Sequence, residues 1–363
     1  MTEILLEKLR KEYGDLIAVN DLTLKVEDKT LVSLLGPSGC GKTTTLKMVA
    51  GLLRPTSGSI YFDGRDVTES SPKDRKIGLV FQDYAVFPHM TAYKNIAYGL
   101  KIKKLSKAEI DKEVRSMAEF LNISEILGKK PYRMTQRELQ AVSLARTLIT
   151  KPSILLLDEP LSNLDAAFRV KMRAELRRLQ MEIEQTVVYV THDQVEAMAM
   201  SDKVAVMNRG LLEQYGAPDE IYKKPASRFV AGFIGTPPMN FIECSFKEER
   251  DKAYLDQGTF RMDVTHLKPI IKACATGEEM ILGVRPEDMR IYDKPPSREA
   301  VEVAIEAYEP MGSESIVYAK LGHSYVRILA PATFKAESNE RRYVAFNMDG
   351  IHVIDKKTEK SIV

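Results

Sequence analysis

One stretch of the chain has residue types and spacing suited to holding phosphate: it reads Gly36-Pro37-Ser38-Gly39-Cys40-Gly41-Lys42-Thr43-Thr44. It lies between an apolar run and a helix-like segment and fits the spacing G-x-x-x-x-G-K-[ST], which requires that context. Glycines let backbone N–H groups turn toward phosphate oxygens, and a helix beginning at Lys42 aims its N-terminus at the same anion. The Lys42 ammonium can pair with the outer phosphates, and the Thr43 hydroxyl can bind Mg²⁺. A turn that only joins strand to helix is the alternative, but the context favours a nucleoside triphosphate site.

Two carboxylates follow a second apolar run. Residues 154–157 lead directly into Asp158 and Glu159. Four apolar residues in a row indicate a strand covered on both faces, as in a parallel sheet. Beside a nucleotide, Asp158 can hold Mg²⁺, usually through water, and Glu159 can polarise the attacking water. An exposed turn would also place acids here, but carboxyl ends of strands meet at one sheet edge, which favours the catalytic interpretation.

Two further polar residues end apolar runs in the same way. Gln82 follows residues 77–81, and His192 follows the strand-like residues 186–191. A lone histidine there is more often structural, whereas within this set it is a candidate partner for the terminal phosphate. Tyr13 lies on a polar turn ahead of the glycine-rich stretch, where position alone favours an ordinary half-buried tyrosine.

The elements that must position these residues alternate between strands and helices. The patterns predict the following: strands 3–9 and 21–26, a helix 42–53, strands 59–62 and 77–81, helices between 92 and 150, a strand ending at Glu159, a helix 166–184, a strand 186–191, a helix after His192, and a strand 204–207. Ser106 with Glu109 forms a capping box for one of the helices. This order implies a mostly parallel sheet with helices on both sides. From about residue 240 short alternating segments replace the helices, which predicts a separate β-rich domain, a small barrel.

Composition narrows the class of protein. A chain of 363 residues predicts two domains. A formal net charge of +2 argues against a nucleic-acid backbone as main partner. Three scattered cysteines suit a reducing compartment and offer neither a zinc site nor a disulfide framework. Since no apolar stretch approaches the roughly 18–20 residues that span a bilayer, we expect membrane association only through a partner.

The combined motifs resemble those of ATP-binding-cassette (ABC) ATPases. The resemblance rests on five stretches in order, matching the Walker A, Q-loop, Walker B, D-loop and H-loop: Gly36–Thr44, Gln82, Leu155–Glu159, Ser162–Asp165 and Thr191–Asp193. Residues 80–91 and 191–198 are similar to the importer subunits for maltose and other sugars, glycerol phosphate or polyamines. Residues 283–288 resemble a motif of that group's C-terminal regulatory domain.

The resemblance implies a fold, domains and roles. A P-loop ABC ATPase domain is expected over 1–235, with a helical subdomain at about 88–150, followed by a small OB-like β-barrel regulatory domain over 236–363. It implies that Tyr13 stacks on adenine, that Gln82 is a Mg²⁺ ligand and sensor, that Glu159 is the general base, and that His192 contacts the γ-phosphate. ATP and Mg²⁺ are the expected cofactors. The stretch after Gln82 is expected to receive a permease subunit at the cytoplasmic face of the membrane, and Asp165 to help join two ATPase subunits.

One motif departs from the family. The signature is usually Leu-Ser-Gly-Gly-Gln, but residues 134–138 here read Met134-Thr135-Gln136-Arg137-Glu138. In the family these glycines let a helix N-terminus approach the γ-phosphate of the opposite ATP. Thr135 and Glu138 instead form a capping box that can occupy those N–H groups, although Thr135 and Arg137 could replace the lost contacts. We therefore expect an asymmetric heterodimer with a second, intact ATPase subunit; a homodimer would be impaired at both sites.

Three functions compete at this point. The first is the ATP-hydrolysing subunit of an importer for a carbohydrate or related small solute. The second is a weakly or non-hydrolytic, ATP-binding regulatory subunit of a heterodimer. The third is a soluble ABC ATPase of translation or DNA repair, disfavoured by the single cassette and the nearly balanced charge.

Overall fold

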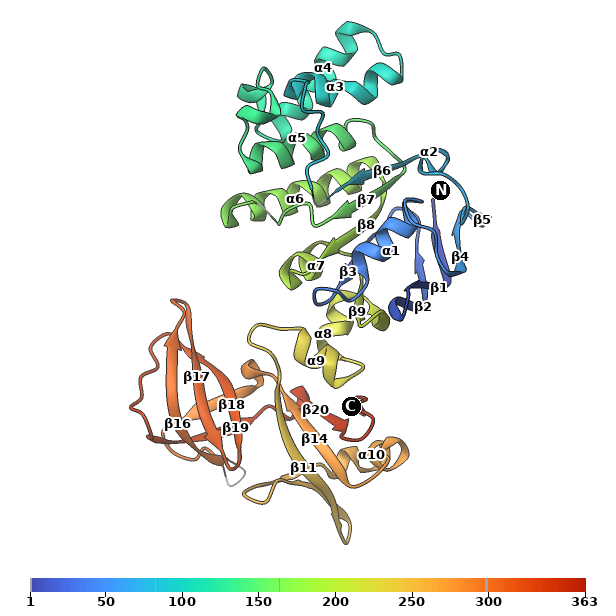
Figure 1. Cartoon of the computed structure of the whole chain (residues 1–363). Helices are drawn as coiled ribbons and strands as arrows, with labels where there is room; N and C mark the ends of the chain where they lie inside the picture. The colour runs from blue at the N-terminus through green and yellow to red at the C-terminus, as the bar shows by residue number, and fades with distance from the viewer. Residues whose placement is uncertain (1, 82, 163, 298–299) are drawn as a thin grey trace. The chain divides into compact units, whose positions relative to one another are not determined.

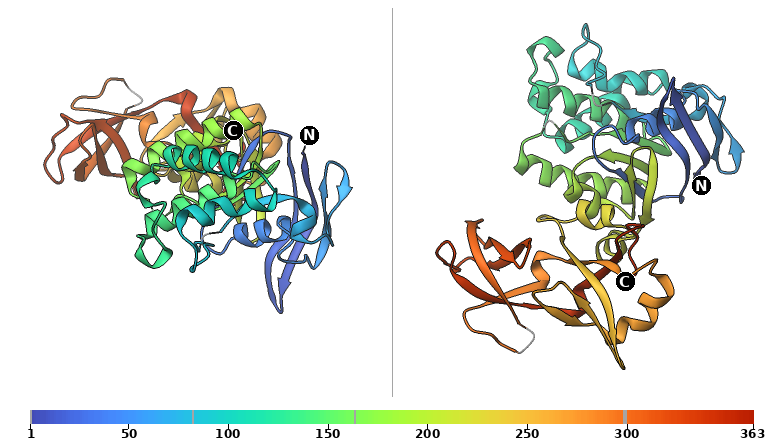
Figure 2. Two further views of the ribbon diagram at one scale, coloured as in Figure 1. Left: turned by 90° about the horizontal axis from the view of Figure 1, so that it is seen from above. Right: turned by 60° about the horizontal axis from the view of Figure 1, so that its bottom comes forward.

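The computed structural model describes residues 2–81, 83–162, 164–297 and 300–363. The chain divides into two compact units, Met1–Pro218 and Asp219–Val363. Figure 1 shows the helices and strands of each unit, and Figure 2 gives two further views.

A six-stranded sheet forms the centre of the first unit, in the order β10-β9-β3-β8-β7-β6. Its strands are β3 (Leu31–Leu35), β6 (Ile77–Val80), β7 (Ile154–Asp158), β8 (Thr186–Thr191), β9 (Lys203–Asn208) and β10 (Leu211–Gly216). The pairs among β9, β3, β8, β7 and β6 are parallel, and β10 pairs antiparallel with β9. The predicted mostly parallel sheet is therefore confirmed.

A second, antiparallel sheet has the order β2-β1-β4-β5. It contains β1 (Ile4–Tyr13), β2 (Leu16–Val26), β4 (Ser57–Phe62) and β5 (Arg65–Asp66). Gly14 has a φ of 58° and lies in the tight connection between β1 and β2, which is the hairpin that the sequence predicted.

Alternate side chains of the central sheet pack into two different cores. Leu155 and Leu157 of β7 contribute to one core with residues of α5 (Gln136–Leu148) and α6 (Ala166–Ile183). Ile154 and Leu156 contribute to the other with α1 (Lys42–Val49) and the antiparallel sheet. All five β7 residues are buried, as expected for a strand covered on both faces. Helices therefore cover both faces, as the strand–helix order predicted.

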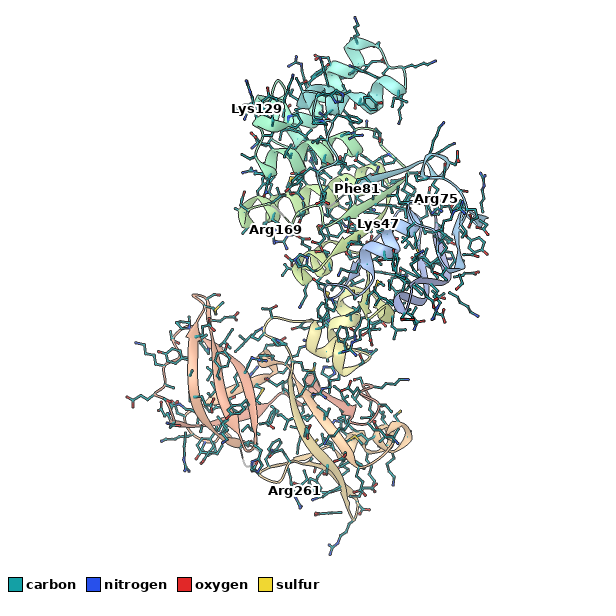
Figure 3. The ribbon with its side chains drawn as sticks, viewed as in Figure 1. Lys47, Arg75, Phe81, Lys129, Arg169 and Arg261 are labelled. Atoms are coloured by element: carbon teal, nitrogen blue, oxygen red, sulfur yellow. The ribbon has the colours of Figure 1, made fainter. Side chains whose placement is uncertain are left out.

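Helix α1 is shorter than the predicted helix 42–53. It ends at Val49, where the buried Arg75 guanidinium donates to the carbonyls of Met48 and Val49, both at 2.7 Å. Gly51 then adopts a φ of 75°. The carbonyls at a helix end need such partners, and Arg75 (Figure 3), which lies on the short helix α2 (Pro72–Arg75), supplies them from a distant part of the chain.

Three α-helices and two 3₁₀ turns follow β6 within or close to the predicted helical segment. They are α3 (Ala92–Ile102), α4 (Lys107–Phe120), η1 (Ser124–Ile126), η2 (Pro131–Arg133) and α5. Both hydrogen bonds of the predicted capping box of α4 are present: the Glu109 N–H donates to Ser106 Oγ at 3.3 Å, and the Ser106 N–H donates to the Glu109 carboxylate at 2.8 Å. The first unit also contains α7 (Gln194–Met200). Among the described residues, no helix combines the length and the apolar character needed to cross a membrane.

The second unit begins with two short helices and continues as two five-stranded antiparallel sheets. The helices are α8 (Pro218–Lys223) and α9 (Arg228–Phe233). The sheets have the orders β13-β12-β11-β14-β20 and β15-β19-β16-β17-β18. Their strands are β11 (Asn240–Glu249), β12 (Lys252–Asp256), β13 (Arg261–Asp263), β14 (Glu279–Val284), β15 (Met289–Tyr292), β16 (Val301–Pro310), β17 (Glu314–Leu321), β18 (Ser324–Pro331), β19 (Arg341–Phe346) and β20 (Ile351–Asp355). Other helical pieces are η3 (Thr265–Leu267), α10 (Lys268–Cys274), η4 (Pro286–Asp288) and η5 (Met348–Gly350).

One buried arginine ties the segment of α8 and α9 to the second unit. The Arg285 guanidinium donates to the carbonyl of Ile234 at 2.9 Å and lies 3.6 Å from the centre of the Tyr222 ring. Burial lowers the pKa of Arg285 despite that contact. The compact units divide at the first residue of α8, whereas the functional boundary expected near residue 235 stays a prediction.

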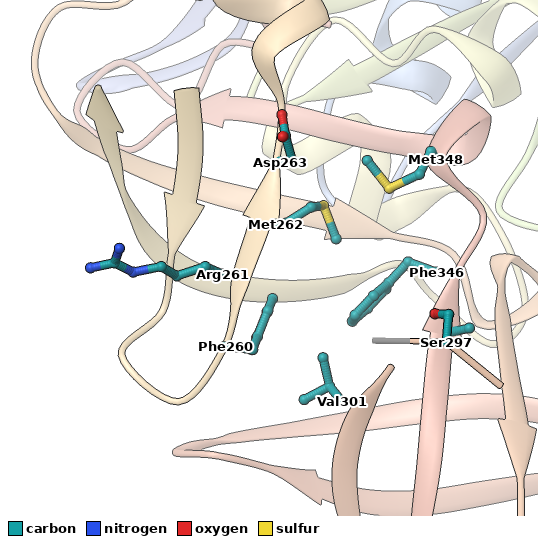
Figure 4. A pocket seen from close by; sticks show the side chains of 9 residues that line it. Phe260, Arg261, Met262, Asp263, Ser297, Val301, Phe346 and Met348 are labelled. Atoms are coloured by element: carbon teal, nitrogen blue, oxygen red, sulfur yellow. The ribbon is translucent and has the colours of Figure 1, made fainter. Parts of the chain in front are cut away.

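A small cavity of about 90 Å³ lies beside β13 and β19 in the second unit (Figure 4). The rings of Phe260 and Phe346 stack along it with centres 5.7 Å apart, and Met262 and Met348 also line it. Ligand pockets usually enclose roughly 300–1,000 Å³. We therefore assign this cavity no ligand.

Candidate active site

The carboxyl ends of β3, β7 and β8 lie together at one edge of the central sheet. Leu35 pairs with Thr191, and Asp158 pairs with Val190. The glycine-rich loop, the two carboxylates and His192 therefore emerge side by side from strands far apart in sequence. The sheet edge brings together the groups predicted from the sequence, as expected for parallel strands.

The glycine-rich loop can pass close to its neighbours because two positions lack a side chain. A Cβ at Gly36 would lie 2.2 Å from the Met207 carbonyl oxygen, and one at Gly41 would lie 2.4 Å from that of Ala18. Gly41 also has a φ of 104° as the N-cap of α1. Ser38 and Gly39 form the exposed part of the loop, and Cys40 is buried below it.

Lys42 points back into the loop. Its side chain is 6% exposed, and its Nζ donates to the carbonyls of Gly36 at 2.7 Å and Pro37 at 2.9 Å. The ammonium is thus held over the concave side of the loop. A cation there, together with free N–H groups at the start of α1, fits a polyphosphate.

Thr43 and Asp158 are in direct contact. The Thr43 hydroxyl donates to Asp158 Oδ1 at 3.0 Å. Burial raises the pKa of the Asp158 carboxyl, and the neighbouring Glu159 adds to the rise, whereas the hydrogen bond from Thr43 opposes it. A Mg²⁺ ion at these oxygens would relieve the cost of the buried carboxylate.

This donor set fits Mg²⁺ bound with a nucleotide. Mg²⁺ prefers oxygen ligands and is usually held by one or two carboxylates together with substrate phosphates. In the part of the chain that the structure describes, no group of three or more His, Cys, Asp or Glu side chains is arranged to hold a metal by itself. Thr43 and Asp158 therefore suit an ion that arrives with the phosphates.

Glu159 and His192 face each other across the ends of β7 and β8. His192 Nδ1 lies 3.2 Å from Glu159 Oε2. Glu159 has a φ of 46°, in the left-handed region, and its N–H donates to the Val190 carbonyl at 3.0 Å. Such a conformation in a residue other than glycine is costly and occurs often at functional sites.

Tyr13 lies on the hairpin turn of the antiparallel sheet. Its ring is half exposed, with Lys11 Nζ 5.2 Å from the ring centre. The adjoining strand β2 contributes Ala18, which contacts the loop at Gly41. Stacking of this ring on adenine stays a prediction. Gln82 lies outside the described residues, so its expected roles as Mg²⁺ ligand and sensor also stay predictions.

The segment 134–138 forms the capped start of α5. The capping box expected here is confirmed: the Glu138 N–H donates to Thr135 Oγ1 at 3.2 Å, and the Thr135 N–H donates to Glu138 Oε2 at 2.8 Å. Lys129 (Figure 3) pairs with the other carboxylate oxygen at 2.9 Å, and this pairing lowers the pKa of Glu138. Arg137 contacts Asp165 at 3.3 Å and the Phe168 ring at 4.0 Å.

Sequence reasoning missed a buried network behind His192. Glu196 is 3% exposed and accepts hydrogen bonds from the Tyr189 hydroxyl at 2.8 Å and the Thr191 hydroxyl at 2.9 Å. Burial raises the pKa of Glu196, and these hydrogen bonds oppose the rise. Arg169 on α6 also joins the network. Arg169 lies in the first turn of α6, where the helix dipole disfavours a positive charge. This unusual position is the signal in the sequence that Arg169 has a specific acidic partner.

Comparison with known proteins agrees with this geometry. The ABC transporter family model matches residues 19–162, and the MalK OB fold domain model matches residues 235–289. The chain is 44% identical to the trehalose/maltose import ATP-binding protein MalK of Thermococcus litoralis, covering all of both chains. It is 39% identical to the sn-glycerol-3-phosphate import ATP-binding protein UgpC of Cereibacter sphaeroides, again over both full lengths.

A solved structure is also similar. The ATP-binding cassette MJ0796, in a dimeric post-hydrolysis state bound to ADP and Pi, has a TM-score of 0.55 and 29% identity. The match covers 59% of this chain and 98% of that one.

The fold and the site define an ABC ATPase, which uses ATP with Mg²⁺. More specifically, the chain belongs to the family of ABC import ATP-binding proteins that carry a C-terminal OB fold domain. The fold class predicted from the sequence is confirmed. The predicted cofactors are also those of the family.

Proposed function

We propose that this chain is the ATP-hydrolysing subunit of an importer for a carbohydrate or a related small solute. The main support is that Lys42, Asp158, Glu159 and His192 lie together at one edge of the central sheet. The chain is also related over its whole length to import ATP-binding proteins. The relatives' names cover trehalose/maltose, oligosaccharides and sn-glycerol-3-phosphate, which support the solute class.

The assembly would place this chain against membrane permease subunits at the cytoplasmic face. The import function in the names of its relatives supports this placement, since an ATP-binding protein that takes part in import acts together with a partner that forms the path across the membrane. The balanced charge of the chain agrees with a protein partner rather than nucleic acid.

Each site residue has a proposed role. The loop Gly36–Thr44 with Lys42 holds the phosphates, and Tyr13 stacks on the base. Thr43, Asp158 and Gln82 hold Mg²⁺, which neutralises charge on the phosphates when bound. Glu159 accepts the proton of the attacking water as it adds to the γ-phosphorus and the bond to ADP breaks, and His192 contacts the γ-phosphate while its Nδ1 side orients Glu159.

The partner ATPase subunit is proposed to be a different chain. The support is the start of α5, where Thr135 and Glu138 hydrogen-bond each other's N–H groups and where Gln136 and Arg137 stand in place of the glycines of the usual signature. A homodimer is the other arrangement, and the dimeric MJ0796 cassette shows that cassettes of this fold can pair. The weakly hydrolytic regulatory subunit is disfavoured by the intact Glu159–His192 pair.

One experiment separates these possibilities. ATPase activity of the purified chain is measured alone and after the five substitutions Met134→Leu, Thr135→Ser, Gln136→Gly, Arg137→Gly and Glu138→Gln. We expect slow turnover by the unaltered chain and a gain of about tenfold or more after restoration, the effect of one or two strong phosphate contacts. Vigorous turnover by the unaltered chain would remove the heterodimer proposal, and no activity in either form would favour the regulatory subunit.

A further inference from the structure

Arg169 joins the two segments that carry Glu159 and His192. It lies near the start of α6 (Figure 3), where its Nη2 donates to the carbonyls of Ser162 at 3.3 Å and Leu164 at 3.2 Å. Its Nη1 donates to Asp193 Oδ2 at 3.3 Å. These acceptors belong to the segment that follows Glu159 and to the segment that follows His192. One guanidinium thus crosslinks both.

The Glu159 side of this crosslink is a closed turn. The Ser162 hydroxyl and the Ser162 N–H both donate to the Glu159 carbonyl, at 3.0 and 3.3 Å. Because Glu159 is held at a φ of 46°, its conformation depends on such neighbours. Arg169 holds the far end of the turn through the Ser162 carbonyl.

The His192 side is anchored by two carboxylates. Asp193 caps α7, since its Oδ1 accepts from the N–H groups of Val195 at 2.8 Å and Glu196 at 3.2 Å, which leaves Oδ2 for Arg169. Glu196 Oε1 lies 3.9 Å from Arg169 Nε, which has no hydrogen-bond partner among the described residues. Glu196 in turn accepts from Tyr189 and Thr191 of β8. The charge of Arg169 is therefore compensated by Asp193 and Glu196, which are hydrogen-bonded to β8, the strand that ends just before His192.

We infer that Arg169 is a positioning residue that holds Glu159 and His192 in register for hydrolysis. The inference rests on the proposed roles of those two residues. The planar guanidinium presents several donors in a fixed fork and reaches both segments at once, whereas a lysine ammonium at this position is a single point charge. Loss of the fork should let the two segments move independently without touching the phosphate-binding loop.

Arg177 provides a matched control on the same helix. Its guanidinium pairs with Asp202 through Nη1 at 2.9 Å and Nη2 at 2.5 Å, away from Glu159 and His192. Arg177→Lys should therefore disturb an ion pair of similar burial and leave the site intact.

The test is single-turnover ATP hydrolysis by excess full-length Arg169→Lys and Arg177→Lys protein, with ATP affinity and Tm measured in parallel. We expect Arg169→Lys to slow hydrolysis at least about tenfold while ATP affinity stays within about twofold, and Arg177→Lys to leave the rate unchanged; a misplaced catalytic group costs rate rather than binding. An unchanged rate in Arg169→Lys, or equal slowing in both variants, would overturn the inference.

Two further variants keep the test decisive. Asp193→Asn retains the capping oxygen but removes the acceptor of Arg169, so it should also slow hydrolysis, and an unchanged rate counts against the crosslink. In a Glu159→Gln background, Arg169→Lys should add almost nothing, because both changes act on the same group. If Glu159→Gln by itself leaves hydrolysis intact, the proposed role of Glu159 fails, a result distinct from failure of Arg169.

Discussion

The Nδ1 of His192 lies 3.2 Å from a carboxylate oxygen of Glu159, although the two residues come from different strands. Glu159 follows β7 and His192 follows β8, and the N–H of Glu159 is bonded to the carbonyl of Val190. The geometry therefore joins a candidate base to a candidate phosphate contact through both side chain and backbone.

Glu159→Gln should abolish hydrolysis but not ATP binding. The amide cannot accept the proton of water, and general-base catalysis contributes about 10²–10⁴-fold. Rates from released phosphate and affinity from equilibrium binding of a fluorescent ATP analogue would check this. Lys42→Ala is the contrasting variant, because it should weaken binding itself; retained hydrolysis in Glu159→Gln would exclude Glu159 as the base.

Asp158→Asn should stabilise the protein without nucleotide and weaken its use of Mg²⁺. Because burial raises the pKa of Asp158, the folded state binds a proton more tightly than the unfolded state does. The ionised carboxylate therefore costs stability as pH rises through that pKa, and the cost is largest at neutral pH. We expect the apparent Tm of the variant at pH 7 to rise by a few degrees, on the scale of about 2–4 °C per kcal/mol.

The same variant needs a functional measurement. A titration of Mg²⁺ against ATPase rate should shift to higher Mg²⁺ concentration, since a carboxylate ligand has become a neutral amide. A Tm gain that persists at a pH well below the raised pKa would contradict the electrostatic explanation, because wild-type Asp158 is then protonated.

Thr135→Ala should cost about 1 kcal/mol of unfolding free energy, the usual cost of removing an N-cap hydroxyl. Ser106→Ala is the matched control, because Ser106 and Glu109 form the same box at α4. Both variants should lose similar stability by urea unfolding. Only Thr135→Ala should change the ATPase activity of the assembled transporter. If both variants changed the activity equally, the start of α5 would have no specific role at the nucleotide.

Asp355→Asn should destabilise the second unit at neutral pH. Burial raises the pKa of Asp355, but four hydrogen bonds from Thr276 and Thr358 outweigh it and lower the pKa well below its ordinary value of 3.8. The carboxylate therefore contributes stability that is present above pH 3.8 and is lost as pH falls through the lowered pKa. We expect a loss of about 1.5–3 kcal/mol at pH 7, the range for hydrogen bonds to charged groups. Hydrogen exchange of the β20 amides at pH 7 and pH 3 would measure this loss. A stability difference between wild type and variant that grows toward pH 3 would contradict the stabilising role of the Asp355 carboxylate.

Local patterns predicted local features well. The boxes at Ser106 and Thr135 are set within four residues, so sequence spacing is sufficient to find them. The buried β7 strand and the order of strands and helices predicted the parallel sheet, and the sheet placed Asp158 near the glycine-rich loop.

Long-range contacts were not predictable in the same way. Helix α1 ends in a local motif at Gly51, whose N–H donates to the Met48 carbonyl while the Leu52 N–H donates to that of Lys47, and this stop signal was present in the sequence. The Arg75 guanidinium that also bonds the last carbonyls is the distant partner that nothing near Val49 indicates. Arg169 finds Asp193 only once α6 and β8 have packed against the same core. The departure at residues 134–138 was visible at once, but its pairing with Lys129 depends on the path of the intervening turn.

The burial of β7 on both faces affects which backbone segments of the proposed nucleotide site can open locally. Amides of Leu155, Leu156 and Leu157 are bonded between β6 and β8 and shielded by two cores, so they should exchange with solvent only through global opening. Asp158 stands at the end of this slowly opening segment, whereas Glu159 begins the turn beyond it. The proposed metal ligand is thereby built on a strand that opens slowly, whereas the proposed base lies just beyond it, on a turn whose position depends on Ser162 and Arg169.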